Sequence, residues 1–136
     1  NIVRFLNLAP GTNFKRPIVL YNEGDPKQIY KLQEESGKGG FSKVYFAKSA
    51  KKKKTVVAVK VMVHRTNKDK KRNESEIMCL RKCQHPNIVT LYEAYDLSTE
   101  AWLIMENLNG GTLQNVVEKI DLAENEMAYI IRNTLE

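Results

Sequence analysis

A glycine-rich turn between two strand-like segments, followed by a lysine on a third, is the feature that most constrains this chain. The turn has the sequence GKGGFSKV over residues 37–44, and the lysine ends the segment VAVK over residues 57–60. Glycine has no Cβ, so main-chain N–H groups in such a turn can approach phosphate oxygens closely. A lysine on a neighbouring strand adds a full positive charge at the same place. The combination predicts a site for a phosphate-bearing ligand.

Length and composition suit a single modest domain with an anionic ligand. The chain has 136 residues, 42% of them hydrophobic, and its 22 Lys and Arg against 16 Asp and Glu give a net charge of +6. This balance is compatible with nucleotide phosphates, nucleic acid or an acidic membrane surface, and it selects none of them. No apolar run approaches the roughly 18 residues of a membrane-spanning helix, and two cysteines make no disulfide framework. We therefore expect no membrane span and a reducing, cytoplasmic setting.

Alternating side chains predict five strands around the turn and the lysine. The strands are expected over residues 29–35, 43–48, 55–63, 88–95 and 101–106. In the third strand, Lys60 shares one face with Ala58 and Met62, because successive side chains of a strand point to opposite faces. The other face of this strand is expected to carry four valines: Val57, Val59, Val61 and Val63.

One main helix is predicted between the third and fourth strands. Thr66 or Asn67 would cap its start, and the His-Pro pair at 85–86 would end it. Residues at helical spacing form the side expected to face the sheet: Asn73, Glu76, Ile77, Leu80, Cys83 and Gln84. Two more helices are expected over residues 112–120 and 122–136. We interpret residues 1–26, which contain several Pro and Gly, as an extension with one added strand at 18–21.

In this order, the motifs resemble the amino-terminal lobe of a protein kinase, over residues 27–136. The similarity is greatest to PAK-type serine/threonine kinases, through GDPK at 24–27, HPNIV at 85–89 and WLIMENLNGGTL at 102–113. The resemblance implies an α+β fold with a five-stranded antiparallel sheet and one main helix. It also implies an N-terminal extension over 1–26, a kinase N-lobe over 27–106, a hinge over 107–111 and the start of a truncated C-lobe over 112–136.

The resemblance also implies an ATP site. Lys60 would contact the α- and β-phosphates, and Glu76 would hold Lys60 through an ion pair. Met105 resembles the gatekeeper, and the main chain of Glu106 and Leu108 would bind the adenine edge. The residues expected around ATP are Ser36, Gly37, Lys38, Gly39, Gly40, Phe41, Ser42, Val44, Ala58, Lys60, Met105, Glu106 and Leu108. Two apolar spines of the family are matched by Leu80 and Leu91, and by Val44, Ala58 and Leu113.

Two residues depart from the family pattern at this site. Ser42 stands where the family has its third glycine, and Ser36 stands where a large aliphatic side chain usually covers the adenine. Losing that apolar contact costs on the order of 1–2 kcal/mol. The expected nucleotide affinity is therefore weak for a kinase.

The sequence contains no His-Arg-Asp and no Asp-Phe-Gly motif. In the family these supply the catalytic aspartate and a ligand of Mg²⁺, and together they allow the γ-phosphoryl of ATP to pass to a protein Ser or Thr. We expect this chain, which begins with Asn1, to be part of a longer protein and to be inactive alone. Apolar residues near Leu108, Leu113 and the last helix are expected to be exposed, and so to meet the missing C-lobe or a second copy.

Other interpretations remain open from the sequence. A pseudokinase or truncated interaction module would share these motifs without catalysis. The basic runs at 51–54 and 68–72 fit solvated charges better than a nucleic-acid site, because no aromatic residues interleave them. A zinc site from Cys79, Cys83, His64 and His85 lacks a Cys-x-x-Cys pair, and reduced, packed cysteines are favoured, with His85 capping the turn after the helix.

Overall fold

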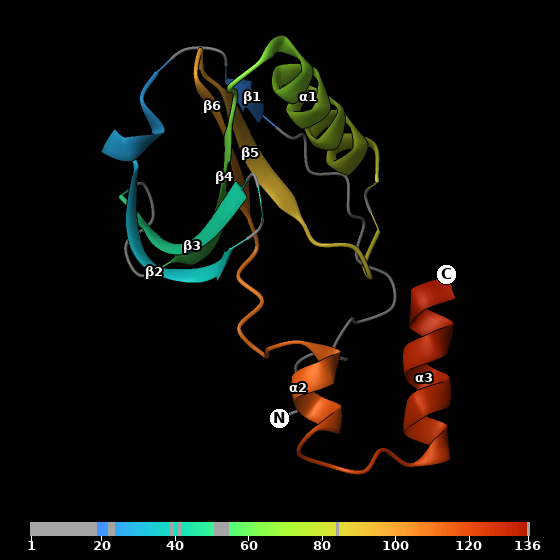
Figure 1. Ribbon diagram of the computed structural model, residues 1–136. Helices are drawn as coiled ribbons and strands as arrows, with labels where there is room; N and C mark the ends of the chain where they lie inside the picture. The colour runs from blue at the N-terminus through green and yellow to red at the C-terminus, as the bar shows by residue number, and fades with distance from the viewer. Residues whose placement is uncertain are drawn as a thin grey trace.

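The computed structural model describes residues 19–21, 24–38, 40, 42–50, 55–83 and 85–135. Its described part is a curved sheet with helix α1 against one face and two further helices beyond the last strand (Figure 1). The elements in chain order are β1 (Val19–Tyr21), the 3-10 helix η2 (Pro26–Gln28), β2 (Tyr30–Lys38), β3 (Ser42–Ser49), β4 (Val56–Val63), α1 (Asn67–Lys82), β5 (Leu91–Asp96), β6 (Glu100–Met105), α2 (Leu113–Val117) and α3 (Glu124–Leu135).

Five strands of the sheet pair antiparallel, in the order β5-β6-β4-β3-β2. This confirms the predicted α+β fold and its five-stranded antiparallel sheet. The added strand expected in the extension is β1, and it pairs parallel with β5, with Val19 opposite Glu93 and Tyr21 opposite Tyr95. Residues 1–18 of the extension lie outside the described residues.

Strand β4 runs through the middle of the sheet, and its alternating side chains divide the core in two, as predicted. Ala58 and Met62 belong to the cluster beneath α1, together with Leu91, Leu103 and Met105. The opposite face buries a second cluster, with β2 and β3 curving away from α1 around it (Figure 1). That cluster contains Tyr30, Ala47, Val57, Val59, Tyr95, Trp102 and Ile104.

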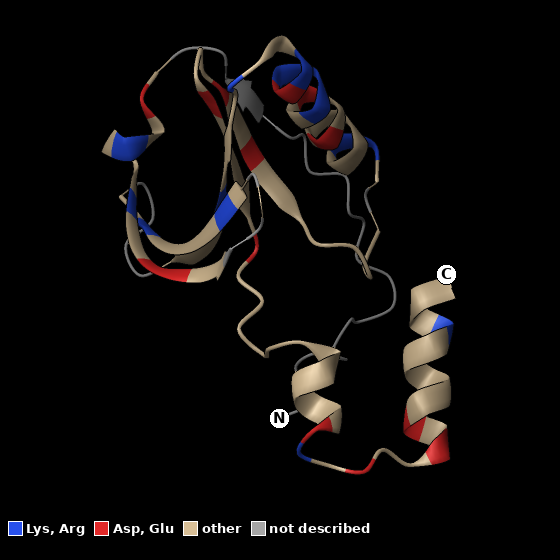
Figure 2. Ribbon diagram, viewed as in Figure 1, with Lys and Arg blue, Asp and Glu red and all other residues tan. Residues whose placement is uncertain are grey.

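Helix α1 begins at the predicted cap. The Thr66 side chain accepts from the main-chain N–H of Asp69, and the Asp69 carboxylate accepts in return from the N–H of Thr66. Asn73 and Ile77 face the sheet and are 3% exposed, while Leu80 packs against the same cluster. Basic residues lie at the start and the end of the helix, and acidic ones lie in its first turn and its middle (Figure 2).

The prediction that the two cysteines pack inside was wrong. The helix ends at Lys82, and Cys83 follows it with φ −84° and ψ 76°, outside the helical region. Cys83 therefore leaves the buried side, and both Cys79 and Cys83 are exposed. Gln84, predicted on the same side, lies outside the described residues.

The two last helices are shorter than predicted. Helix α2 starts after Thr112, whose side chain caps Asn115, and it ends at Val117. Apolar side chains are exposed here as expected: Leu108, Leu113, Ile131 and Leu135 are 56%, 48%, 58% and 81% exposed. In the described part of the chain, no helix is both long enough and apolar enough to span a bilayer.

Candidate nucleotide-binding site

Lys60 and Glu76 form the predicted ion pair between β4 and α1. The Lys60 Nζ lies 2.5 Å from the Glu76 Oε1, and the two side chains are 24% and 37% exposed. Lys60 therefore lies on the side of the sheet that α1 covers, because Glu76 belongs to the inward side of that helix. The pair is partly open to solvent, so an anion can still reach the ammonium group.

Apolar side chains surround this pair on the same face of the sheet. Val44 on β3 lies opposite Lys60, and Ala58 on β4 lies opposite Met105 on β6. Ala58 and Met105 are each 9% exposed, and Val44 packs against their cluster. The side chains of Ala58 and Met105 thus form an apolar wall on the same face of the sheet as the charged pair.

The glycine-rich turn (residues 37–42) stands between β2 and β3 in the chain. No described atom lies within 4 Å of a Cβ built on Gly37 or Gly40, and neither residue has a left-handed φ. Ser36 is exposed and Ser42 is half-buried. Gly39, Phe41 and the side chain of Lys38 lie outside the described residues.

An ion pair ties the two strands together beside the turn. The Lys43 Nζ lies 3.0 Å from the Glu35 Oε2, and the hydrogen bond and charge of Glu35 raise the pKa of Lys43 above its usual range. The pair links β2 and β3 where their register shifts, between Glu35 and Gly37.

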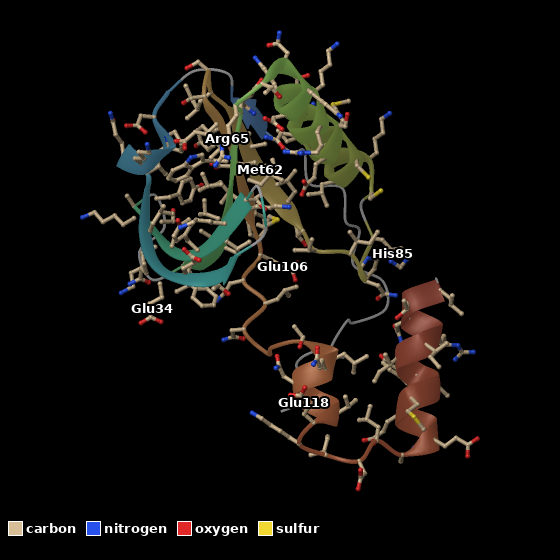
Figure 3. The ribbon with its side chains drawn as sticks, in the orientation of Figure 1. Glu34, Met62, Arg65, His85, Glu106 and Glu118 are labelled. Atoms are coloured by element: carbon tan, nitrogen blue, oxygen red, sulfur yellow. The ribbon has the colours of Figure 1, made fainter. Side chains whose placement is uncertain are left out.

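The segment after β6 has main-chain groups that can meet a flat polar ligand. The main-chain N–H of Glu106 donates to the carbonyl of Thr90 at 3.0 Å, and the Glu106 carboxylate accepts from the N–H of Thr90 at 3.1 Å. These bonds hold Glu106 where the chain leaves the sheet (Figure 3). The carbonyl of Glu106 and the main chain of exposed Leu108 bond no other described residue.

The structure brings together most of the apolar spine positions. Leu91 and Ala58 belong to one buried cluster, and Leu80 from α1 and Val44 from β3 pack against it. Leu113, at the start of α2, is 48% exposed and is not part of that cluster.

The comparisons with known proteins decide the family. The protein kinase domain family matches residues 30–136. This chain belongs to the protein kinase family. It is 40% identical over 111 residues to the probable serine/threonine-protein kinase mkcB of Dictyostelium discoideum, and 37% identical over 141 residues to mkcD of the same organism. It is also 31% identical over 115 residues to the serine/threonine-protein kinase CST20 of Candida albicans.

These matches cover 81%, 95% and 85% of the chain, and 15%, 22% and 9% of the respective relatives. The chain therefore spans less than a quarter of the length of the curated kinases it matches. The predicted resemblance to serine/threonine kinases, PAK-type kinases among them, is confirmed.

Protein kinases in general use ATP together with Mg²⁺. Among the described residues, no group of three His, Cys, Asp or Glu side chains is placed to hold a metal ion. The cysteine–histidine set named as a zinc alternative is likewise not gathered there. His85 instead accepts a hydrogen bond at Nδ1 from the N–H of Asn87 at 3.1 Å, within the turn that follows α1, as predicted.

Sequence reasoning missed one polar cluster near this site. His64 follows β4, and its Nδ1 lies 3.0 Å from the Nδ2 of Asn73 on α1, while its Nε2 lies 3.4 Å from the Oδ1 of Asp96 on β5. The available signal was Asn73, a polar residue on a helix side predicted to be buried, since buried polar groups are nearly always hydrogen-bonded.

Proposed function

We propose that this chain is the ATP-binding part of a serine/threonine protein kinase, whose whole protein transfers the ATP γ-phosphoryl to Ser or Thr of a protein substrate. The observation that supports this most is the Lys60–Glu76 ion pair at 2.5 Å on the α1-covered face. An ammonium group held by a carboxylate, and still partly exposed, is oriented to bind phosphate oxygens. In this proposal 27–106 is the N-lobe, 107–111 the hinge and 112–136 the start of the C-lobe.

Lys60 then contacts the α- and β-phosphates, and the glycine-rich turn covers them. The open space above Gly37 and Gly40 supports this role. Packing against described atoms does not require glycine at these two positions, and neither does a left-handed φ. A close approach of main-chain N–H groups to phosphate does require it. Ser36, Lys38, Gly39, Phe41 and Ser42 complete the turn in this proposal.

Adenine binds against the apolar wall next to the phosphates. Val44 and Ala58 contact one face of the base, and Met105 lies at its inner end. The carbonyl of Glu106 accepts from the base, because the N–H of Glu106 is already used by Thr90. The main chain of Leu108 supplies the second hydrogen bond.

Phosphoryl transfer also needs groups that these 136 residues do not contain. The sequence has neither His-Arg-Asp nor Asp-Phe-Gly, so it provides no catalytic aspartate and no ligand set for Mg²⁺. We therefore assign to this chain the binding and orientation of ATP, and we expect no turnover from it alone.

A domain exchange tests the assignment. Residues 30–136 replace the matching segment of the Dictyostelium kinase mkcB, and phosphoryl transfer to a general serine/threonine substrate protein is measured. The exchanged protein should be active, and Lys60→Met should abolish its activity. Lys48→Met is the matched control, because Lys48 is an exposed strand lysine with no ion pair to another described residue. Full activity of a folded Lys60→Met protein would refute the role of Lys60.

A non-catalytic interaction module is the second candidate. The exposed apolar side chains of α2 and α3 support it, since surfaces of this kind mark protein interfaces. Sedimentation of the chain shows whether this surface binds a second copy. Self-association that Ile131→Glu abolishes, together with no ATP binding in the exchanged kinase, would favour the module over the enzyme.

A further inference from the structure

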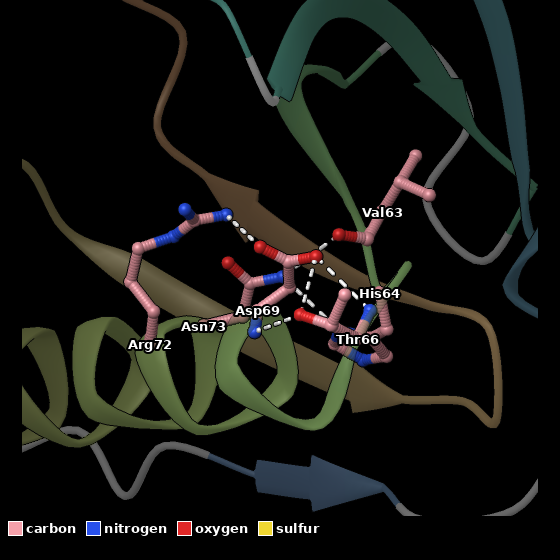
Figure 4. A network of polar contacts seen from close by, with 6 residues as sticks. All are labelled: Val63, His64, Thr66, Asp69, Arg72 and Asn73. Carbon is pink, nitrogen blue, oxygen red and sulfur yellow. Dashed lines mark hydrogen bonds and ion pairs between the residues drawn. The ribbon is translucent and has the colours of Figure 1, made fainter.

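The buried contact between Asn73 and His64 fixes the direction of its own hydrogen bonds. Asn73 is 3% exposed, and its Nδ2 lies 3.4 Å from the carbonyl oxygen of Val63 and 3.0 Å from the Nδ1 of His64 (Figure 4). A carbonyl oxygen can only accept, so Nδ2 donates one hydrogen to it and the other to His64. Nδ1 of His64 is therefore unprotonated, and the ring proton lies on Nε2.

His64 is also held by two other parts of the chain, one through its ring and one through its main chain. Its Nε2 faces the Oδ1 of Asp96 on β5 at 3.4 Å, and the side chain of His64 is 4% exposed. The main-chain N–H of His64 donates to the carbonyl of Thr99 at 2.8 Å, in the turn between β5 and β6. With both ring nitrogens in contact and the main chain bonded to Thr99, His64 presents Nδ1 to α1 in one orientation.

Asn73 lies one helical turn before Glu76, on the same side of α1. The other inward contacts of the helix, from Ile77 and Leu80, are apolar and do not fix a direction. The hydrogen bond of Asn73 restricts how the helix can turn about its axis, because the strength of a hydrogen bond depends on its distance and angle. It thus determines the rotation of α1 about its axis, and with it where the Glu76 carboxylate points.

We propose that His64 and Asn73 are positioning residues, which hold α1 in the rotation that brings Glu76 to Lys60. The inference rests on the proposed function, because it assigns the pair a part in binding ATP. Asp96 contributes by fixing the ring proton on Nε2. Neither His64 nor Asn73 touches the nucleotide in this arrangement.

The first experiment measures the His64 ring nitrogens by ¹⁵N NMR in the full 136-residue chain at neutral pH. We expect Nδ1 to have the shift of an unprotonated acceptor and Nε2 that of a protonated nitrogen. The opposite tautomer, or a doubly protonated ring, would overturn the inference. This readout does not depend on nucleotide binding.

The second experiment compares ATP affinity among variants of the kinase carrying residues 30–136. Asn73→Leu and His64→Leu should weaken ATP binding by roughly two- to thirtyfold. Ile77→Val is the matched control, since Ile77 is equally buried on the same helix but forms no side-chain hydrogen bond; its affinity should change less than about twofold. His64→Asn, which keeps an acceptor near the position of Nδ1, should recover most of the affinity.

Equal losses in Asn73→Leu and Ile77→Val would show a merely structural role and overturn the proposal. If the exchanged kinase with the wild-type segment bound no ATP, the proposed function would fail on its own account. Amide hydrogen exchange then decides the positioning role: exchange around Glu76 should accelerate in Asn73→Leu and not in Ile77→Val. Equal exchange in the two variants would again contradict it.

Discussion

Asn87, in the turn after α1, donates a hydrogen bond from its Nδ2 to the main-chain oxygen of Asn133 in α3, at 2.9 Å. The two residues are 46 positions apart and the contact is part-buried. Asn87 belongs to the HPNIV segment that carries the kinase resemblance. The bond therefore connects the sheet-bearing part of the chain with its last helix.

Asn87→Ala should loosen that connection. Removing a part-buried donor costs about 1 kcal/mol, and the loss should be felt in α3 because the acceptor lies there. Amide hydrogen exchange should accelerate in α3 while α1 remains protected. Asn109→Ala, in an exposed turn, is the control. Unchanged exchange in α3 would mean that the bond does not hold the helix.

Ser36→Ile should raise the affinity for ATP. Ser36 is exposed at the end of β2, where a large aliphatic residue can cover the adenine. The added apolar contact is worth about 1–2 kcal/mol, or roughly 5- to 30-fold in affinity. Titration of the kinase carrying residues 30–136 with ATP checks this, and Ser36→Thr should give little gain. Equal affinities for the wild-type and Ser36→Ile proteins would place adenine elsewhere.

Thr66→Ala should destabilise α1 by about 1 kcal/mol, because it removes the helix cap. The Thr66 side chain also lowers the pKa of Asp69 below its ordinary value of 3.8. The ionised Asp69 therefore stabilises the fold above that value, and this contribution is lost as the pH falls through the lowered pKa. Denaturation at several pH values should show a wild-type advantage near neutral pH that shrinks in acid. An advantage that grows in acid would contradict this sign.

Cys79→Ala should make Cys83 more reactive towards alkylation at neutral pH. The two sulfurs lie 3.9 Å apart, and the hydrogen bond and charge of Cys79 raise the pKa of Cys83 above its usual 9.0. Without Cys79, more Cys83 is thiolate, which is the reactive form. Iodoacetamide labelling followed by peptide mass spectrometry measures the rate at Cys83. A slower rate in the variant would mean that Cys79 does not raise this pKa.

The sequence predicted the strands and their faces well, because alternation along β4 is a local property. Val57, Val59 and Val61 on one face of β4, and Ala58, Lys60 and Met62 on the other, lie where the period of two places them. The Lys60–Glu76 contact also followed, since each residue had a defined face on its own element. The Thr66 cap was predictable because its partner Asp69 is three residues away.

Other features depend on long-range contacts or on where an element ends. Parallel pairing of β1 with β5 joins segments that are far apart in the sequence, and no local pattern encodes it. Cys83 was misplaced because the helix stops at Lys82, two residues before the end of the predicted pattern at Gln84. The His64–Asn73–Asp96 cluster joins three separate elements, so only the polar residue on a buried helix side indicated it.

A double-mutant cycle over Lys60 and Glu76 tests the central claim most directly. ATP affinity is measured for the kinase carrying residues 30–136 and for its Lys60→Met, Glu76→Gln and doubly substituted forms. If Glu76 acts by holding Lys60 on the phosphates, Glu76→Gln should weaken binding about fivefold in the presence of Lys60. It should have almost no effect in the Lys60→Met background. The same loss in both backgrounds would contradict the account.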